Sequence, residues 1–164
     1  MVRSIPGFRK PQGLLFVASL DKLFVASGDD GMLRVYRGRT FELLDSIKLG
    51  LGPNRIAYDP QADVLYVEYG GAEAGKDYGE VAIIDPATDE PIIAIRVASY
   101  PAELLLTHSG NRLFVFASVA SKIQVIDTKK RTIVASWSVS GKRPGDAAFD
   151  EASERLLFGA LLQR

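Results

Sequence analysis

The sequence predicts an all-β fold built from one unit of four short antiparallel strands that repeats along the chain. Apolar runs of four to eight residues, rich in Val, Ile, Phe and Tyr, are separated by turns rich in Gly, Asn, Asp and Ser. Similar runs recur, as in KLFVAS at 22, VLYVEY at 64 and RLLFGA at 155. No stretch keeps an apolar stripe of helical period for the length of a helix. We therefore expect strands throughout.

Two independent sets of landmarks give the same repeat spacing, 42, 48 and 43 residues. One set is Pro11, Pro53, Pro101 and Pro144, and the other is Leu23, Leu65, Leu113 and Leu156. A third set, LRVYR at 33, VAIID at 81 and IQVID at 123, is spaced by 48 and 42 residues. The six extra residues of the second unit therefore lie in GGAEAGKDYG, between its second and third strands. The units span approximately 10–50, 51–98, 99–140 and 141–164.

The third unit shows the four strands most clearly, as AELLLT, RLFVFAS, KIQVID and TIVASWSV. In each unit the first two strands are apolar almost throughout, as in a sheet covered on both faces, and the last two alternate more. Four antiparallel strands repeating every 40-odd residues is the period of a β-propeller blade. The sequence therefore predicts an incomplete β-propeller ring of three blades and half of a fourth.

The second unit carries the most specific likeness. The stretches GPNRIAYDPQADVLYVEY and GEVAIIDPATDEPIIAIRVA resemble the YVTN-repeat β-propellers, a bacterial family of the WD-repeat-like superfamily. The resemblance covers nearly all of the chain, although VYRGRTF departs from the pattern in the first unit and the fourth stops at RLLFGALLQR. It implies the fold but no activity, because one scaffold hosts many functions.

The same resemblance implies an exported protein, periplasmic or secreted, provided that a leader has been removed. The first residues, MVRSIPGFRKPQG, contain no apolar segment of the kind found in signal peptides. Without such a leader the expected compartment is the cytoplasm.

An open ring raises the question of what covers its ends, because propellers typically need four to eight blades. The first and last units would each expose an apolar face, and RLLFGALL would present an unpaired strand edge. At roughly 25 cal/mol per Å² of apolar area, leaving such a face exposed loses roughly 10 kcal/mol of the stability that its burial would provide. Two explanations stay open: a longer propeller, favoured because the chain ends within a blade, or self-association of copies through the open faces.

Composition narrows the function classes. The 20 basic and 20 acidic residues balance, so no field attracts nucleic acid. No apolar run reaches the roughly 20 residues of a membrane-spanning helix, so no membrane insertion is expected. With no cysteine and a single histidine, neither zinc nor haem is expected, and we predict no cofactor.

Four positions, each two residues after a landmark proline, are predicted to face the central channel. They are Gly13, Arg55, Glu103 and Asp146. Polar residues there have two interpretations: a ring that binds an anion, a cation or a small polar ligand, or ion pairing between blades. We favour ion pairing of Arg55 with Glu103, and with Asp146, because such networks are common without function.

The insertion YGGAEAGKDYGE at 69–80 is predicted to lie on the face where the chain enters the inner strands. Loops carry contacts more often than scaffolds do, so Tyr69, Lys76, Asp77, Tyr78 and Glu80 are candidates for binding a ligand or partner. The alternative is a tolerated surface insertion. Gly70, Gly75 and Lys76 have the spacing of a phosphate-binding loop. However, Asp77 stands where Ser or Thr is needed and no helix follows, so no nucleotide site is expected.

Three other features have structural interpretations. SGDDG at 27–31 predicts a hairpin turn rather than a calcium site. His108 is predicted in a solvated turn on the face opposite the insertion. Trp137, in the last strand of the third unit, is predicted to be buried between blades.

We therefore expect a non-catalytic propeller that serves as a scaffold for a protein partner or a small polar ligand. The alternative is part of a propeller enzyme, lactonase-like or quinoprotein-like, with a metal or cofactor in the central channel. Asn54, Glu103 and Asp146 would be the nearest candidate ligands for such a group.

Overall fold

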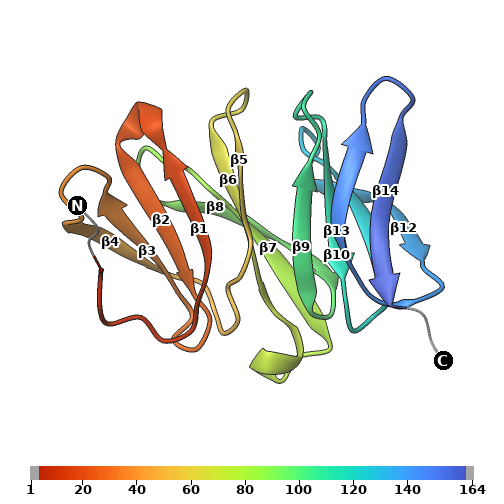
Figure 1. Ribbon diagram of the computed structural model, residues 1–164, viewed down its shortest axis with the longest axis horizontal. Helices are drawn as coiled ribbons and strands as arrows, with labels where there is room; N and C mark the ends of the chain where they lie inside the picture. The colour runs from red at the N-terminus through yellow and green to blue at the C-terminus, as the bar shows by residue number, and fades with distance from the viewer. Residues whose placement is uncertain (1–3, 162–164) are drawn as a thin grey trace.

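A computed structural model describes residues 4–161, with the backbone alone for residues 72, 73 and 142, and shows four antiparallel sheets in chain order (Figure 1). The first sheet contains β1 (Pro11–Val17), β2 (Lys22–Ser27), β3 (Met32–Arg37) and β4 (Leu43–Lys48). The second contains β5 (Ile56–Asp59), β6 (Val64–Gly70), β7 (Tyr78–Ile84) and β8 (Pro91–Ala98). The third contains β9 (Pro101–Leu106), β10 (Arg112–Ala117), β11 (Lys122–Asp127) and β12 (Thr132–Ser138). The fourth has two strands, β13 (Lys142–Asp150) and β14 (Arg155–Leu161).

Each strand pairs with the next one along the chain, so every sheet is a meander. The predicted all-β class, with partial propeller blades of four antiparallel strands, is confirmed. We call the sheets blades 1 to 3 and β13–β14 the half blade. Two short 3₁₀ turns complete the elements, η1 (Ala18–Leu20) and η2 (Gly71–Ala74). Among the described residues, no helix has the length and apolar character needed to cross a membrane.

The turn between the third and fourth strands has the same form in blades 1 to 3. A backbone N–H bonds to the carbonyl four residues earlier, at Phe41, Asp89 and Arg131, and all three residues have positive φ. In blades 2 and 3 an aspartate opens the turn and its carboxylate accepts a backbone N–H, at Ala87 and at Lys130. The first blade forms this turn without the aspartate, so its departure in sequence does not change the fold.

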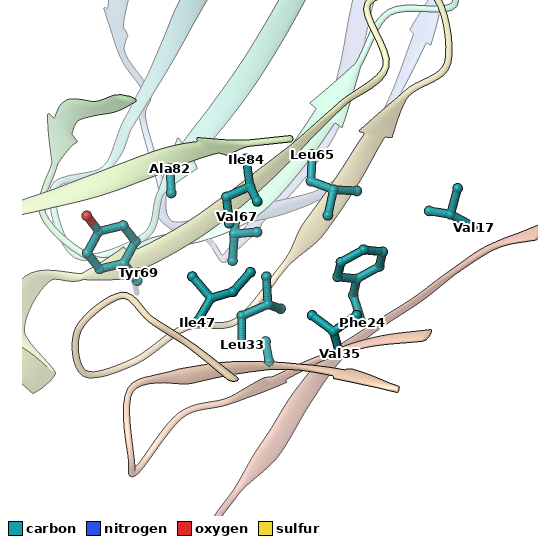
Figure 2. Packing of buried hydrophobic residues seen from close by; sticks show 11 residues of the cluster. Val17, Phe24, Leu33, Val35, Ile47, Leu65, Val67, Tyr69, Ala82 and Ile84 are labelled. Atoms are coloured by element: carbon teal, nitrogen blue, oxygen red, sulfur yellow. The ribbon is translucent and has the colours of Figure 1, made fainter. Parts of the chain in front are cut away.

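The hydrophobic cores lie between blades rather than within them. In Figure 2, Phe24, Leu33 and Val35 of blade 1 face Leu65 and Val67 of blade 2. A second core joins blades 2 and 3, and a third joins blade 3 to the half blade. The inner strands β1, β5, β9 and β13 lie next to one another across these boundaries. A single blade therefore cannot bury both of its faces alone.

The outer face of blade 1 is covered in part by the chain's own first residues. Ile5 and Phe8 pack on Leu23, Val25 and Tyr36, which are buried beneath them. The Phe8 and Tyr36 rings lie 5.8 Å apart, centroid to centroid. The prediction of an exposed apolar face is therefore wrong for β2 and β3, because residues 4–10 turn back over them. It is confirmed for β1, where Leu14 and Phe16 are 68% and 52% exposed.

The opposite end is open, as predicted. β14 pairs only with β13 among the described strands, and Leu157 is 61% exposed. The prediction that Trp137 is buried is wrong, since its side chain is 47% exposed. Its ring contacts Phe114 across 6.4 Å, but β13 and β14 stand over the inner strands of blade 3 and leave β12 uncovered.

Blades 1 and 2 are also joined by a polar contact. The ammonium group of Lys22, at the start of β2, donates to the carbonyls of Pro86 and Ala87, at 2.9 and 3.0 Å, and to Asp89 Oδ2 at 2.7 Å. Both charged side chains are largely buried, and burial raises the pKa of Asp89. Removing one partner of such a pair leaves the other charge without compensation.

We predict that Lys22→Met lowers the free energy of unfolding by about 3 kcal/mol, because Asp89 loses its buried partner. Urea unfolding followed by circular dichroism measures this. The matched control is Lys130→Met, which breaks a more exposed pair with Asp127 (3.7 Å) and is expected to cost about 0.5 kcal/mol or less. Equal effects of the two substitutions would contradict the prediction.

A second prediction concerns the first residues. Phe8→Ala is expected to cost about 2 kcal/mol, since it uncovers Tyr36 and Val25. Leu14→Ala, on the same outer face but already solvated, is expected to change stability by less than about 0.5 kcal/mol. Unfolding midpoints in urea compare the two variants, and a loss for Leu14→Ala equal to that for Phe8→Ala would contradict it.

Candidate functional site

Two of the four predicted channel positions meet between blades 2 and 3. Arg55 lies just before β5 and Glu103 lies in β9, and Arg55 Nη2 is 3.3 Å from Glu103 Oε2. The predicted ion pair between these two residues is thus present. Because the Arg55 side chain is about half exposed, the pair contributes about 1 kcal/mol or less.

The other two positions contribute differently. Gly13 is a close-packing position, because a Cβ there would lie 1.9 Å from the Asn54 carbonyl oxygen. Asp146 is exposed on β13 and borders a shallow hollow together with Arg143 and Gly145. No ion pair joins Asp146 to Arg55 or Glu103 in the described part of the chain. The expected ring of polar side chains is therefore assembled at one boundary only.

The central member of this cluster is Glu68, which sequence reasoning missed. Its Oε1 accepts the backbone N–H of Arg55 at 3.3 Å, and its own backbone binds Asn54 and Arg55. The side chain is fully buried, and Oε2 has no hydrogen-bond partner among the described residues. Burial, with a further contribution from the charge of Glu103, raises the pKa of Glu68 to about 8. The sequence does single out Glu68 as a candidate site residue, because it is the one charged residue of the strand VLYVEYG.

The insertion 69–80 lies on the same side of the molecule as this cluster. Gly70 N–H donates to the Leu51 carbonyl at 2.8 Å, and a Cβ on Gly71 would lie 2.5 Å from the Tyr100 nitrogen. The loop therefore packs on both segments that enter the inner strands β5 and β9. In Figure 1 this loop, with its 3₁₀ turn, projects opposite the β5–β6 and β9–β10 turns. His108 lies in the β9–β10 turn, where its N–H donates to Glu151.

The candidate residues within the loop have unequal roles. Tyr69 is buried in the core between blades 1 and 2 (Figure 2). Tyr78 lies between two cations, with Lys76 Nζ 5.0 Å and Arg96 Cζ 4.4 Å from its ring centroid. Lys76 also pairs with Glu80 at 3.3 Å, and Asp77 is exposed. The loop thus presents Lys76, Asp77 and Tyr78, and Tyr69 anchors its base.

In its described residues, this region lacks the features of a phosphate-binding loop and of a metal site. A phosphate-binding loop needs a helix to follow it, whereas the segment after Gly70 is a single 3₁₀ turn followed by β7. Among the described residues no three or more histidine, aspartate or glutamate side chains gather in a way that could hold a metal ion. What the cluster offers is an exposed guanidinium, the Glu103 carboxylate, and a buried carboxyl with a spare oxygen.

Comparison with known proteins supports the fold alone. No family model matches the chain, and no curated protein matches it. Among solved structures, it is similar to the hydrazine synthase of Kuenenia stuttgartiensis, with a TM-score of 0.77 and 20% identity over 94% of this chain. It is also similar to the computationally designed protein Ika8, with a TM-score of 0.73 and 15% identity over 92% of this chain. This chain is propeller-like in fold, and it spans 43% and 42% of the lengths of those two chains.

The raised pKa of Glu68 predicts a pH-dependent stability. The folded protein binds the Glu68 proton more tightly than the unfolded chain does. The stability that this proton contributes to the folded state is therefore fully present below the unfolded pKa of about 4.5. It is lost as pH rises towards about 8, by an amount of up to roughly 5 kcal/mol. Glu68→Gln removes the titrating group. Between pH 5 and pH 9 the melting temperature of the unsubstituted protein is therefore expected to fall more than that of the variant.

A matched control for this measurement is Glu80→Gln, a partly exposed carboxyl of the same face. The Glu80 variant keeps Glu68, so it should still lose stability as pH rises towards about 8. Parallel profiles for the Glu68 variant and the unsubstituted protein would contradict the prediction.

Proposed function

We propose that this chain is a non-catalytic binding scaffold whose ligand is a small polar molecule with a hydrogen-bond donor, bound at the cluster of Glu68, Arg55 and Glu103. The observation that carries the proposal is the spare carboxyl oxygen of Glu68. Above a pH of about 8, where Glu68 loses its proton, this oxygen is a buried acceptor without a partner among the described residues. Such an acceptor costs stability, and a ligand N–H or O–H placed there would offset that cost, so binding of the ligand is coupled to loss of the Glu68 proton.

In this proposal the ligand reaches Glu68 after a movement of the Arg55 side chain. Its carboxyl is buried while the Arg55 side chain beside it is half exposed and held by one ion pair. Swinging Arg55 away from Glu103 costs about 1 kcal/mol or less, and also frees Glu103 to bind the same ligand. Lys76, Asp77 and Tyr78 of the neighbouring loop would contact the part of the ligand that stays outside, or a protein partner on the same face.

The proposal includes the family and the cellular location of the protein. The repeat pattern quoted above supports membership of the YVTN-repeat propellers, and that resemblance supports a bacterial, exported protein. Loops set on a rigid repeat scaffold commonly carry binding residues.

The test is made above a pH of about 8, where Glu68 is ionised, and it uses two cations of equal charge, of which only one has N–H donors. Methylammonium chloride is expected to shift the backbone amide NMR signals of Arg55, Glu68 and Leu104 in a saturable way. Tetramethylammonium chloride is expected to leave them unchanged, since it offers no N–H to Glu68.

Glu68→Leu should abolish the response to methylammonium, whereas Lys130→Ala, on the opposite face, should preserve it. The proposal fails if the two cations act alike, or if Glu68→Leu still responds. Because the amide spectrum also reports folding, a misfolded variant would be recognised, and Glu68→Gln would then take its place.

A further inference from the structure

A hollow lies at the boundary between blades 2 and 3, on the face opposite the insertion. It has a volume of about 280 Å³ and is formed by the β5–β6 turn of one blade and the β9–β10 and β11–β12 turns of the next. Most of the residues that line it are of polar type, and they include Asp59, Asn111, Thr128, Lys129 and Arg131. Neither the channel cluster nor the loop at 69–80 contributes to it.

The chain itself shows what fills the equivalent place one boundary earlier. There, Lys22 places its ammonium group against the Pro86 and Ala87 carbonyls and Asp89. Position 64 corresponds to position 22, since each opens the second strand of its blade, and it holds Val64. Val64 therefore places no ammonium group against the β11–β12 turn, and the hollow lies at this position.

The turn that would receive this group is preserved in shape. Thr128 and Lys129 stand where Pro86 and Ala87 stand, and Arg131 stands where Asp89 does. Arg131 and Asp89 have the same hydrogen bond and nearly the same φ, 56° and 65°. Two carbonyls that bind an ammonium group in one blade thus have counterparts in the next, with a guanidinium in place of the carboxylate.

An acid is supplied from the other side of the hollow. Asp59 is 2% exposed, and its Oδ1 accepts the backbone N–H groups of Gln61 and Ala62 at 2.9 and 3.2 Å. Gly110 allows the next blade to approach, because a Cβ there would lie 3.1 Å from both Asp59 oxygens. The hollow therefore offers acceptors, at Asp59 and, by correspondence with the preceding boundary, at the Thr128 and Lys129 carbonyls, and it is also lined by two cationic residues, Lys129 and Arg131.

We propose that this hollow binds a small zwitterion of the amino-acid type. Its ammonium group takes the place that Lys22 fills at the preceding boundary, between the Thr128 and Lys129 carbonyls and Asp59. Its carboxylate faces Arg131 and Lys129, since a guanidinium binds a carboxylate through paired N–H donors. A simple anion would satisfy only the cationic residues, and a simple amine only the acceptors.

The inference is independent of the proposed function, because the two sites share no residue. It is tested on the full chain with L-alanine, acetate and methylammonium as probes, followed by the amide signals of Gly110, Thr128 and Arg131. We expect L-alanine to bind at least fivefold more tightly than either single-charge probe. Equal binding of acetate and L-alanine would overturn the proposal in favour of a plain anion site, and no response to L-alanine would overturn it altogether.

Substitutions make the test specific. Arg131→Ala should weaken L-alanine binding at least fivefold, whereas Lys130→Ala, in the same turn but outside the hollow, should not. The pair Val64→Lys with Arg131→Asp rebuilds the Lys22 contact, so it should fill the hollow and abolish binding. If that pair does not fold, the comparison of Arg131→Ala with Lys130→Ala still decides, because both positions are exposed. Unchanged binding in Arg131→Ala would overturn the proposal.

Discussion

Burial between neighbouring sheets is the constraint on which the rest of this structure depends. Each blade has two apolar faces, and the second strand of blades 1 to 3 is buried almost throughout. A face is removed from water only when another element lies on it. The arrangement of neighbouring sheets, the turns between their strands and the close contacts at glycines all serve this stacking. The polar sites are found where the stacking leaves room for polar side chains, at the two ends of one boundary.

The two ends of the array meet the same constraint in different ways. At blade 1 the chain folds back, and Ile5 and Phe8 take the place of a neighbour over the second and third strands. At the other end, two strands cover the inner part of blade 3, so Trp137 and the β14 edge stay in contact with solvent. Exposed edges of this kind are where further strands can be added.

Much of the fold could be predicted from the sequence, because strand patterns, turn residues and repeat spacing are local signals. The strands of blade 3 and the ion pair of Arg55 with Glu103 were predicted on that basis. What could not be predicted depends on contacts distant in sequence. The covering role of Phe8 and the exposure of Trp137 depend on how much of a neighbouring sheet is present. Glu68 was missed because an acid in a buried strand is informative only once its surroundings are known.

The Lys22 contact has a consequence for how the repeats find their order. Blades of similar shape risk docking on the wrong neighbour while the chain folds, as repeat proteins do when they misassemble. If blade 1 docked on blade 3 instead of blade 2, Lys22 would meet Arg131 where it now meets Asp89. Blade 1 has Val17 where blade 2 has Asp59, so no acid would offset the two like charges, and their repulsion would penalise that arrangement. The residue that differs between two otherwise equivalent turns, Asp89 or Arg131, thus favours blade 2 over blade 3 as the neighbour of blade 1.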